Sequence, residues 1–427
     1  MVYMQKSYTV PLGKTVRQLA RLRGGGSALP GLVVEKIDPD FVRRTLAQLP
    51  LGVIVISGSN GKTTTTKMIV ELLESHDIKV FTNRTGSNFV RGVAAALLGE
   101  VDNKGILGAE IAVLELDEAH GVRFVETIQP DYVLLLNVMR DQLDRFGEVD
   151  TIARLVTQIA SKASKGVVVN RDDPRLNSIK VPTVLRTFGT SPKLQSLFPS
   201  DDNLHSVPTA KTVRPRLTDD VSLERLDGQK ATIAYGGKKV TVNLQINGIY
   251  NVLNAVAAFA LCRMVLGDEL DERRLLGKLQ TITPAFGRGE SFVIDGQKVE
   301  IILVKNPAGF RLSLASFPPE GHKTMIAIND NYADGRDMSW LWDVDFVDLQ
   351  KEGVAMVSGI RAYDMSLRLQ YDEVPIADVN TKLIPAFKQF ITSDQDTPKR
   401  IFCTYTAMLA VRREIGKLTK IEEAITR

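Results

Sequence analysis

The chain has 427 residues, of which 44% are hydrophobic and 24% charged, as in ordinary globular proteins, and this length suggests two or three domains. The net charge of +4 is small, so it does not favour nucleic acid as a partner, although it allows an acidic substrate or a weakly attractive membrane surface. The only cysteines, Cys262 and Cys403, are too far apart in the sequence to suggest a disulfide framework or a thiolate zinc site.

Residues 1–50 are predicted to form an N-terminal segment that leads into the main fold. The stretch LGKTVRQLARLRGGGSALPG predicts a basic helix that stops at three glycines, followed by a turn at Pro30. This end of the chain has no apolar core of signal-peptide length, and no apolar run reaches spanning length. We therefore expect a cytoplasmic protein without a transmembrane segment.

Strands and helices alternate from residue 51 to about 185. The strand VIVIS is followed by the helix TTTTKMIVELLESH, whose apolar residues recur at helical spacing. KVFTN, IAVLELDE, DYVLLLNV and GVVVNRD predict further strands, and FVRGVAAALLGE predicts another helix. This alternation indicates a parallel sheet covered by helices on both faces.

The stretch VIVISGSNGKTTTT, residues 53–66, is typical of a phosphate-binding loop between a strand and a helix. We expect Lys62 to reach the β- and γ-phosphates and the Thr63 hydroxyl to hold Mg²⁺. The remaining nucleotide-binding candidates of the loop are Gly58, Ser59, Asn60, Gly61 and Thr64. Ile56 stands where the general motif has its first glycine. A glycine-rich turn with a chance lysine is the alternative, and the order of strand, loop, lysine, threonine and helix counts against it.

Glu115 lies at the end of the predicted strand IAVLEL, and the carboxyl ends of parallel strands face the ligand crevice in open α/β sheets. Its carboxylate is therefore a candidate to share Mg²⁺ with Thr63, and otherwise it is a solvated strand end. Asp117 and Glu118 add negative charge nearby.

Residues 186–245 are rich in Pro, Ser and Asp, and they predict an irregular insertion that ends in a hairpin with Gly-Gly at its turn. NGIYNVLNAVAAFALCRMVLG predicts a loop and a buried helix. After Pro284 the alternation restarts, which predicts a central domain over residues 51–284 and a smaller α/β domain over residues 285–427.

Several motifs resemble those of the Mur ligases, which make peptide bonds in cell-wall precursors. These are GSNGKTT, LNVMRDQLDRFG, NGIYNVLNAVAA and FGRGE. The resemblance implies that Asn251 and Asn254 contact the nucleotide, although alone they would more often cap a helix, and that Arg288 bridges the domains onto the phosphates. Gln142 stands where the peptide-forming ligases carry a histidine, which counts against a plain amino-acid-adding enzyme.

The stretch INDNYADGRDMSWLWDVDF, with TNRTGSN, LELDEA, KNPAGF and TYTAML, resembles the MurT family over nearly the whole chain. That resemblance implies ATP and Mg²⁺, a GatD-like glutaminase partner that supplies ammonia, and amidation of the D-glutamate carboxylate of membrane-anchored lipid II at the inner face of the membrane. It also implies that one loop aspartate completes the glutaminase site, and our choice is Asp337, with Asp334, Asp343 and Asp345 as alternatives.

Two other functions stay open on the sequence alone. One is a Mur-type ligase that adds an amino acid to a carboxylate, and the other is a nucleotide-binding scaffold without activity. Intact Lys62, Thr63 and Glu115 count against the scaffold. Many MurT chains carry a four-cysteine zinc ribbon, and residues 186–245 contain no cysteine, so we do not expect zinc.

Overall fold

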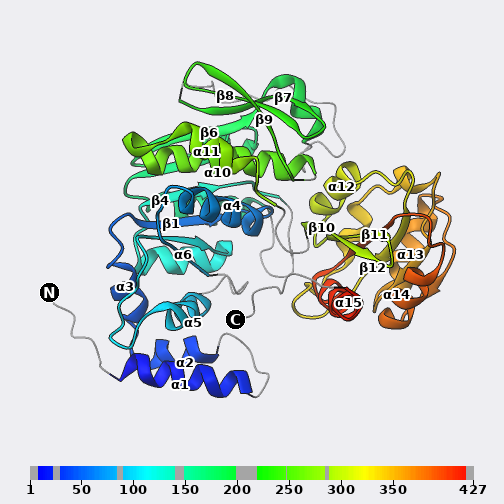
Figure 1. Ribbon diagram of the computed structural model, residues 1–427, viewed down its shortest axis with the longest axis horizontal. Helices are drawn as coiled ribbons and strands as arrows, with labels where there is room; N and C mark the ends of the chain where they lie inside the picture. The colour runs from blue at the N-terminus through cyan, green and yellow to red at the C-terminus, as the bar shows by residue number, and fades with distance from the viewer. Residues whose placement is uncertain are drawn as a thin grey trace.

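Two sheet-based bodies make up the protein, a larger one that begins at the N-terminus and a smaller one on the right of Figure 1. The computed structural model describes residues 8–22, 29–83, 90–139, 149–198, 219–246, 248–283 and 288–419. The larger body is built on a nine-stranded sheet in the order β2-β3-β1-β4-β5-β6-β7-β8-β9, and the smaller one on a six-stranded sheet. The predicted α/β class is therefore confirmed.

The larger sheet is parallel from β2 through β7 and ends in the antiparallel strands β8 and β9. Its strands are β1 (Gly52–Ser57), β2 (Val80–Thr82), β3 (Ile111–Glu115), β4 (Tyr132–Leu135), β5 (Gly166–Asn170), β6 (Val184–Thr190), β7 (Val221–Asp227), β8 (Lys230–Tyr235) and β9 (Lys238–Asn243). Its helices are α1 (Thr9–Leu22), α2 (Leu29–Ile37), α3 (Phe41–Leu46), α4 (Lys62–Glu74), α5 (Val90–Glu100), α6 (Glu118–Thr127), α8 (Val149–Ala160), α9 (Pro174–Asn177), α10 (Ile249–Leu266) and α11 (Glu272–Leu279).

Side chains of β1 alternate between two hydrophobic cores, one on each face of the sheet. Ile54 and Ile56 pack into the core that α4 and α10 cover, and Val53 and Val55 pack into the core on the side of α5, α6 and α8. Because successive side chains of a strand point to opposite faces, a continuous apolar strand is what a sheet covered on both faces requires. This arrangement confirms the predicted helices on both faces.

Helix α10 is the central core helix of the larger body. The segment Ile249–Glu269 is long and apolar enough to cross a membrane, with a hydropathy of 1.7, although no such run was expected from the sequence. However, 67% of the most apolar stretch of this segment is buried inside the protein. Phe259 is fully buried and meets Tyr235 edge to face, with ring centroids 5.0 Å apart. These contacts identify the helix as part of a packed core.

The prediction of an irregular insertion over residues 186–245 is wrong for β6 and β7. These strands extend the main sheet, since Phe188 pairs with Asn170 on one side and with Val221 on the other. The hairpin is confirmed as β8 and β9, with Gly236 and Gly237 at positive φ in its turn. Strands at the end of a sheet have one solvated face, so their hydrophobic signal is weak. Residues 199–218 lie outside the described part of the chain.

The predicted turn at Pro30 is also wrong, because Pro30 lies in the first turn of α2. Proline is well suited to that position, where its missing N–H would have no helical partner. The predicted basic helix before it is confirmed as α1. Residues 284–287 lie outside the described chain, so the domain boundary near residue 284 stays a prediction.

The smaller sheet has the order β10-β11-β15-β12-β13-β14, in which only the hairpin of β10 and β11 is antiparallel. Its strands are β10 (Arg288–Ile294), β11 (Gln297–Leu303), β12 (Lys323–Ala327), β13 (Met356–Ser358), β14 (Val379–Asn380) and β15 (Lys399–Cys403). Its helices are α12 (Pro307–Ser316), α13 (Ala362–Tyr371), α14 (Leu383–Thr392) and α15 (Tyr405–Leu418). Helices α12 and α13 pack on one face, and α14 and α15 pack on the other.

Phe259→Ala should lower the free energy of unfolding of the larger body by about 3–5 kcal/mol, because it leaves a cavity between α10 and the sheet. Denaturant unfolding followed by circular dichroism measures this loss. Val184→Ala is the control, since Val184 is 49% exposed and its truncation should change stability by no more than about 0.5 kcal/mol. Equal unfolding midpoints for the two variants would contradict the assigned role of α10.

Candidate functional site

The loop between β1 and α4 has the shape that phosphate binding requires. Gly58 and Gly61 adopt φ values of 132° and 89°, in the left-handed region that glycine tolerates best. A Cβ on Gly58 would lie 2.9 Å from the carbonyl oxygen of Asn137, so the close approach of the two segments also needs glycine. Helix α4 begins at Lys62, and its N-terminus therefore opens directly onto the loop.

The segment that follows β4 clamps this loop from one side. Asn137 accepts the Asn60 N–H through its side-chain oxygen at 2.8 Å, and its amide nitrogen donates to the Asn60 carbonyl at 3.0 Å. The Ser59 hydroxyl donates to the Met139 carbonyl and accepts the Met139 N–H, both at 2.9 Å. The role of Asn137 in holding the loop was not predicted from the sequence, where Asn137 is only part of the LNVMRDQLDRFG motif. Gln142 lies outside the described residues.

Lys62 is buried at the mouth of the loop. Its ammonium donates to the Gly58 carbonyl at 2.5 Å and to the Glu118 carboxylate at 3.2 Å. The two charged side chains are only 9% and 4% exposed. A buried ammonium needs such partners, because desolvation penalises an uncompensated charge. The predicted phosphate-binding lysine thus lies within the curve of the loop that would surround a phosphate.

Thr63 and Glu115 lie together, as the sequence predicted. The Thr63 hydroxyl donates to the Glu115 carboxylate at 3.0 Å. Asn83 holds the Glu115 backbone through two hydrogen bonds, of 2.8 Å to its carbonyl and 3.0 Å from its N–H. Asn83 follows β2 at the same edge of the sheet, and its role was not predicted.

These two side chains fit a magnesium ion. Hydroxyl and carboxylate oxygens are hard ligands, and Mg²⁺ commonly takes only one or two protein ligands and completes its octahedron with water and phosphate. Within the described ranges, no group of three or more His, Cys, Asp or Glu side chains gathers to hold a metal ion. The arrangement of Thr63 with Glu115 therefore suits an ion that is bound largely through a nucleotide.

The smaller domain contacts the same loop from the other side. Lys305 donates to the Ser59 carbonyl at 3.1 Å, and the side-chain amides of Asn60 and Asn306 exchange two hydrogen bonds of 3.3 and 3.1 Å. Asn306 also caps α12 by accepting the Gly309 N–H at 2.7 Å. The roles of Lys305 and Asn306 were not predicted from the KNPAGF motif, because their hydrogen-bond partners Ser59 and Asn60 are remote in the sequence.

The other predicted nucleotide contacts differ in how well the structure places them. Asn254 is buried against the loop, since a Cβ on Gly61 would lie 2.5 Å from its side-chain oxygen. Asn251 lies three residues earlier in α10 and is half-buried. Arg288 begins β10, and its side chain lies outside the described part. The structure thus brings Asn254 to the loop, and the roles of Asn251 and Arg288 stay predictions.

Asp337 lies on the loop that follows β12, and Trp340 anchors this loop to the domain core. Trp340 is buried and meets Phe310 edge to face, with ring centroids 6.3 Å apart. The Asp337 carboxylate is partly exposed and accepts the Ser339 N–H at 2.8 Å. Within the described chain, no hydrogen bond or ion pair joins Asp337 to residues 58–63. Its predicted role in a partner's site therefore stays a prediction.

The alternative aspartates of this loop have different surroundings. Asp334 is buried and accepts the N–H and hydroxyl of Thr406 at 2.7 and 2.6 Å. Burial raises the pKa of Asp334, and the hydrogen bonds from Thr406 only partly offset that rise. Asp345 is exposed and accepts the Val347 N–H at 2.9 Å, and Asp343 is half-exposed. Asp334 thus serves the fold of the loop, and Asp337, Asp343 and Asp345 stay candidates for a role in a partner's site.

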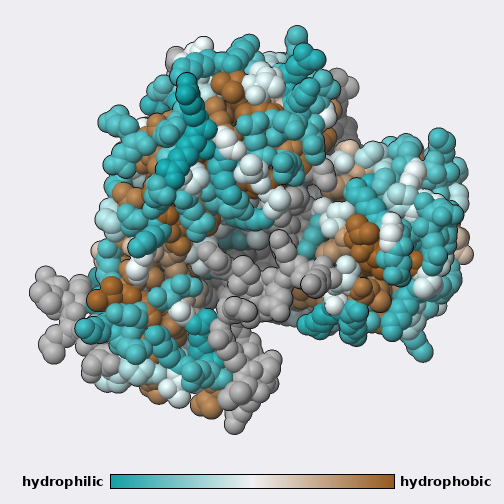
Figure 2. Space-filling model, in the orientation of Figure 1, coloured by the Kyte–Doolittle hydropathy of each residue, from teal (hydrophilic) through white to brown (hydrophobic). Residues whose placement is uncertain are grey.

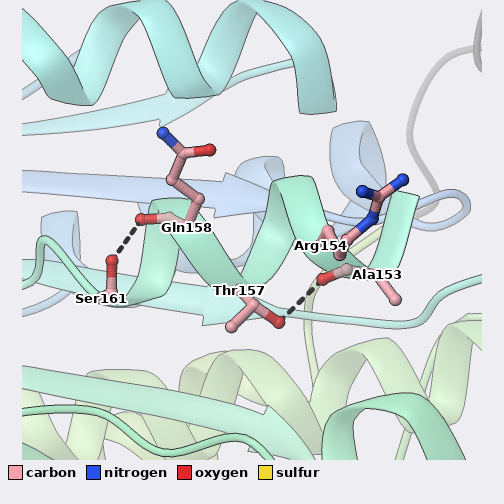
Figure 3. Close-up of a pocket in the computed structure, with 5 residues that line it drawn as sticks. All are labelled: Ala153, Arg154, Thr157, Gln158 and Ser161. Atoms are coloured by element: carbon pink, nitrogen blue, oxygen red, sulfur yellow. Dashed lines mark hydrogen bonds between the residues drawn. The ribbon is translucent and has the colours of Figure 1, made fainter. Parts of the chain in front are cut away.

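A hollow of about 440 Å³ on α8 does not compete with this site. Figure 3 shows its lining, which comes from a single helix. The Thr157 hydroxyl donates to the Ala153 carbonyl and the Ser161 hydroxyl to the Gln158 carbonyl, both at 2.7 Å. Because these polar groups bond back onto their own helix, they do not converge on a ligand.

Comparison with known proteins agrees with this geometry. Residues 56–262 match the Mur ligase middle domain, and residues 303–408 match the MurT ligase C-terminal family. The chain is similar to subunit MurT of lipid II isoglutaminyl synthase (glutamine-hydrolyzing) from Streptococcus pneumoniae (strain ATCC BAA-255 / R6), at 29% identity over 92% of this chain and 93% of that protein. The same subunit from Staphylococcus aureus (strain COL) is 30% identical over 87% of this chain and 89% of its own.

Solved structures share the fold. A pseudomurein peptide ligase type C from Methanothermus fervidus superposes with a TM-score of 0.68 at 19% identity, over 89% of this chain and 81% of its own. MurF ligase from Thermotoga maritima in complex with ADP superposes with a TM-score of 0.66 at 19% identity, over 88% of this chain and 81% of its own. The resemblance read from the sequence motifs is thus confirmed along nearly the whole chain, which belongs to the MurT family of ATP-dependent Mur-type ligases.

Proposed function

We propose that this chain uses ATP to amidate the α-carboxylate of D-glutamate in the stem peptide of lipid II, with ammonia from a GatD-like glutaminase. Support comes from its relatives, which are named as subunits of a glutamine-hydrolysing lipid II isoglutaminyl synthase. The observation that carries the proposal is the site in which buried Lys62 and Glu115 lie beside Thr63, on a loop that Asn306 of the smaller domain bonds through Asn60.

The proposed reaction has two steps. A carboxylate oxygen attacks the γ-phosphorus of ATP, the bond to the bridging oxygen breaks, and ADP leaves. Ammonia then attacks the carbonyl carbon of the acyl phosphate, loses a proton, and expels inorganic phosphate to leave the amide. No side chain needs to form a covalent bond to the substrate, so the task of the protein is orientation and charge neutralisation.

The residues of the site divide this task. Backbone N–H groups of the loop and the N-terminus of α4 would bind the β-phosphate, and Lys62 would neutralise charge on the transferred phosphoryl group. Thr63 and Glu115 would hold Mg²⁺, which supplies positive charge to the phosphate oxygens. Asn306 and Lys305 hold the smaller domain against the loop, so that groups from both domains would meet at one nucleotide.

An aromatic surface on the smaller domain supports the proposed partner. Trp342 is 47% exposed and meets Tyr371 edge to face at 5.1 Å. Other large exposed side chains of this domain are Tyr332 and Val347, between β12 and β13, and Ile360, Tyr363 and Leu367, in α13 and directly before it. Tyr and Trp are the residues that most often anchor protein interfaces. This surface lies on the same domain as Asp337, as a shared glutaminase site would require. We place the complex in the cytoplasm, where ATP and the soluble partner are found.

The proposal is tested by purifying the chain with the candidate glutaminase and supplying lipid II, ATP and glutamine. Mass spectrometry should show the loss of one hydroxyl and the gain of one amino group at the D-glutamate residue. ADP formation without any amide would contradict the proposed acceptor.

Lys62→Ala should reduce amidation by about 10²-fold or more, because it removes a charge that stabilises the transferred phosphoryl group. The rate of ADP formation in the presence of lipid II and ammonia measures this loss. Lys67→Ala, one turn further along α4, is the control and should retain the parent rate. Near-normal turnover of the Lys62 variant would exclude it from the nucleotide site.

Glu115→Gln should shift the Mg²⁺ concentration for half-maximal activity upward and lower the maximal rate. The amide keeps the shape of the side chain and loses the charge that Mg²⁺ prefers. Activity measured over a magnesium titration gives both quantities. Overlapping titrations of parent and variant would show that Glu115 is not a ligand.

Asp337→Asn should impair amidation that depends on glutamine and retain much of the activity with free ammonia. A carboxylate that orients a catalytic histidine acts only in the glutaminase half-reaction. Asparagine keeps the side-chain oxygen that accepts the Ser339 N–H, so the loop should fold normally.

Asp345→Asn is the matched control, since Asp345 accepts the Val347 N–H in the same way at 2.9 Å. Glutamine hydrolysis by the complex should stay normal in this variant. Normal hydrolysis in the Asp337 variant would disprove the shared site, and failure of ammonia to rescue it would assign Asp337 to the ligase reaction instead.

A further inference from the structure

Helix α1 forms an outer layer of the larger body together with α2. Its inner side packs closely, since Val10 and Ala20 are buried and a Cβ on Gly13 would lie 2.7 Å from Leu98 and 2.9 Å from Val34. Figure 1 shows α1 and α2 beyond α5 at one end of the molecule. One side of α1 is thus fixed to the protein, and its other side faces outward.

The outward side of α1 carries apolar side chains. Tyr8, Leu12 and Leu19 are 54%, 43% and 55% exposed. Tyr8 precedes the first helical residue and accepts the Leu12 N–H at 3.0 Å, so the helical turn includes it. Spacings of four and seven residues place the three side chains in one stripe. In Figure 2, apolar side chains reach the surface at the end of the molecule where Figure 1 draws α1 and α2.

The N-terminal sequence that contains this stripe has charge of a single sign. The sequence holds five basic and no acidic residues between positions 1 and 34, namely Lys6, Lys14, Arg17, Arg21 and Arg23. Because the whole chain has a net charge of +4 and this stretch contributes +5, the rest of the chain sums to −1. The basic character of the protein is therefore concentrated on α1 and its immediate flanks.

We propose that α1 docks on an anionic lipid bilayer, with Tyr8, Leu12 and Leu19 inserted among the headgroups and the positive net charge of the N-terminal sequence attracted to the lipid phosphates. An apolar stripe on a helix of basic charge and low overall hydrophobicity is the pattern of helices that lie in the membrane interface. Clustered Lys and Arg side chains on such a helix add attraction to anionic lipids. The inference rests on the proposed function, because a lipid-linked substrate gives the ligase a reason to stay at the bilayer.

Sedimentation with vesicles tests the docking on the full-length chain. The parent should bind vesicles of phosphatidylglycerol and phosphatidylcholine, and bind vesicles of phosphatidylcholine alone about tenfold less. High salt should weaken binding, because it screens the attraction. Leu12→Glu/Leu19→Glu should reduce binding to the anionic vesicles by about tenfold or more, since it replaces inserted apolar side chains by repelled charges.

Val184→Glu/Val293→Glu is the matched control. It adds the same charge at valines that are 49% and 63% exposed on other parts of the surface, and it should bind as the parent does. Thermal unfolding of both variants confirms that they fold. Equal binding by the parent and the α1 variant would overturn the proposal, as would a parent that binds no vesicles. A parent dimer that the α1 substitutions convert to a monomer would instead identify the stripe as a protein interface.

Amidation assays separate this inference from the proposed function. In complex with the glutaminase, the α1 variant should amidate lipid II in anionic vesicles at least several-fold more slowly than the parent, and a water-soluble short-chain analogue at the parent rate. Equal rates on vesicle-embedded lipid II would overturn the docking. A parent that binds vesicles but amidates neither substrate would disprove the proposed function and leave the docking supported.

Discussion

The architecture of the site depends on how the four residues from Gly58 to Gly61 are held. Two glycines turn the backbone into a conformation that other residues avoid, and hydrogen bonds then fix it from two sides. Asn137 binds the loop from within the same sheet, and Asn306 binds it from the other domain. The side-chain amides of Asn137 and Asn306 each use both their donor and their acceptor in these bonds, so the loop is held in a single geometry.

This rigidity lets the protein bury charge where it is useful. Lys62 and Glu118 are withdrawn from water, which is costly for each ion alone and acceptable only with well-placed partners. A low-dielectric setting also strengthens the attraction between the lysine and a phosphate. The hydrogen bonds that order the loop therefore also keep Lys62 in the buried position where it would attract a phosphate most strongly.

On the proposed function, the smaller domain would serve two tasks from one edge of its sheet. Lys305 follows β11 and touches the loop, whereas Asp337 lies on the loop after β12, and both strands run in parallel with β15 between them. The carboxyl ends of parallel strands meet at one edge, as they do in most α/β enzymes. On the proposed function, this edge presents one group to the nucleotide and another to the ammonia-supplying partner. A short path between the two reactions would follow from that placement.

The sequence alone determined the strand, loop and helix of the phosphate site, because those elements are local and their order along the chain is sufficient. Pairing of Thr63 with Glu115 was also predictable, since both follow the carboxyl ends of parallel strands. Contacts of Asn83, Asn137 and Asn306 were not, because each joins segments that only the sheet order and the packing of two domains bring together. The same reason explains β6 and β7, whose weak apolar signal becomes a strand only when a neighbouring strand supplies its hydrogen bonds.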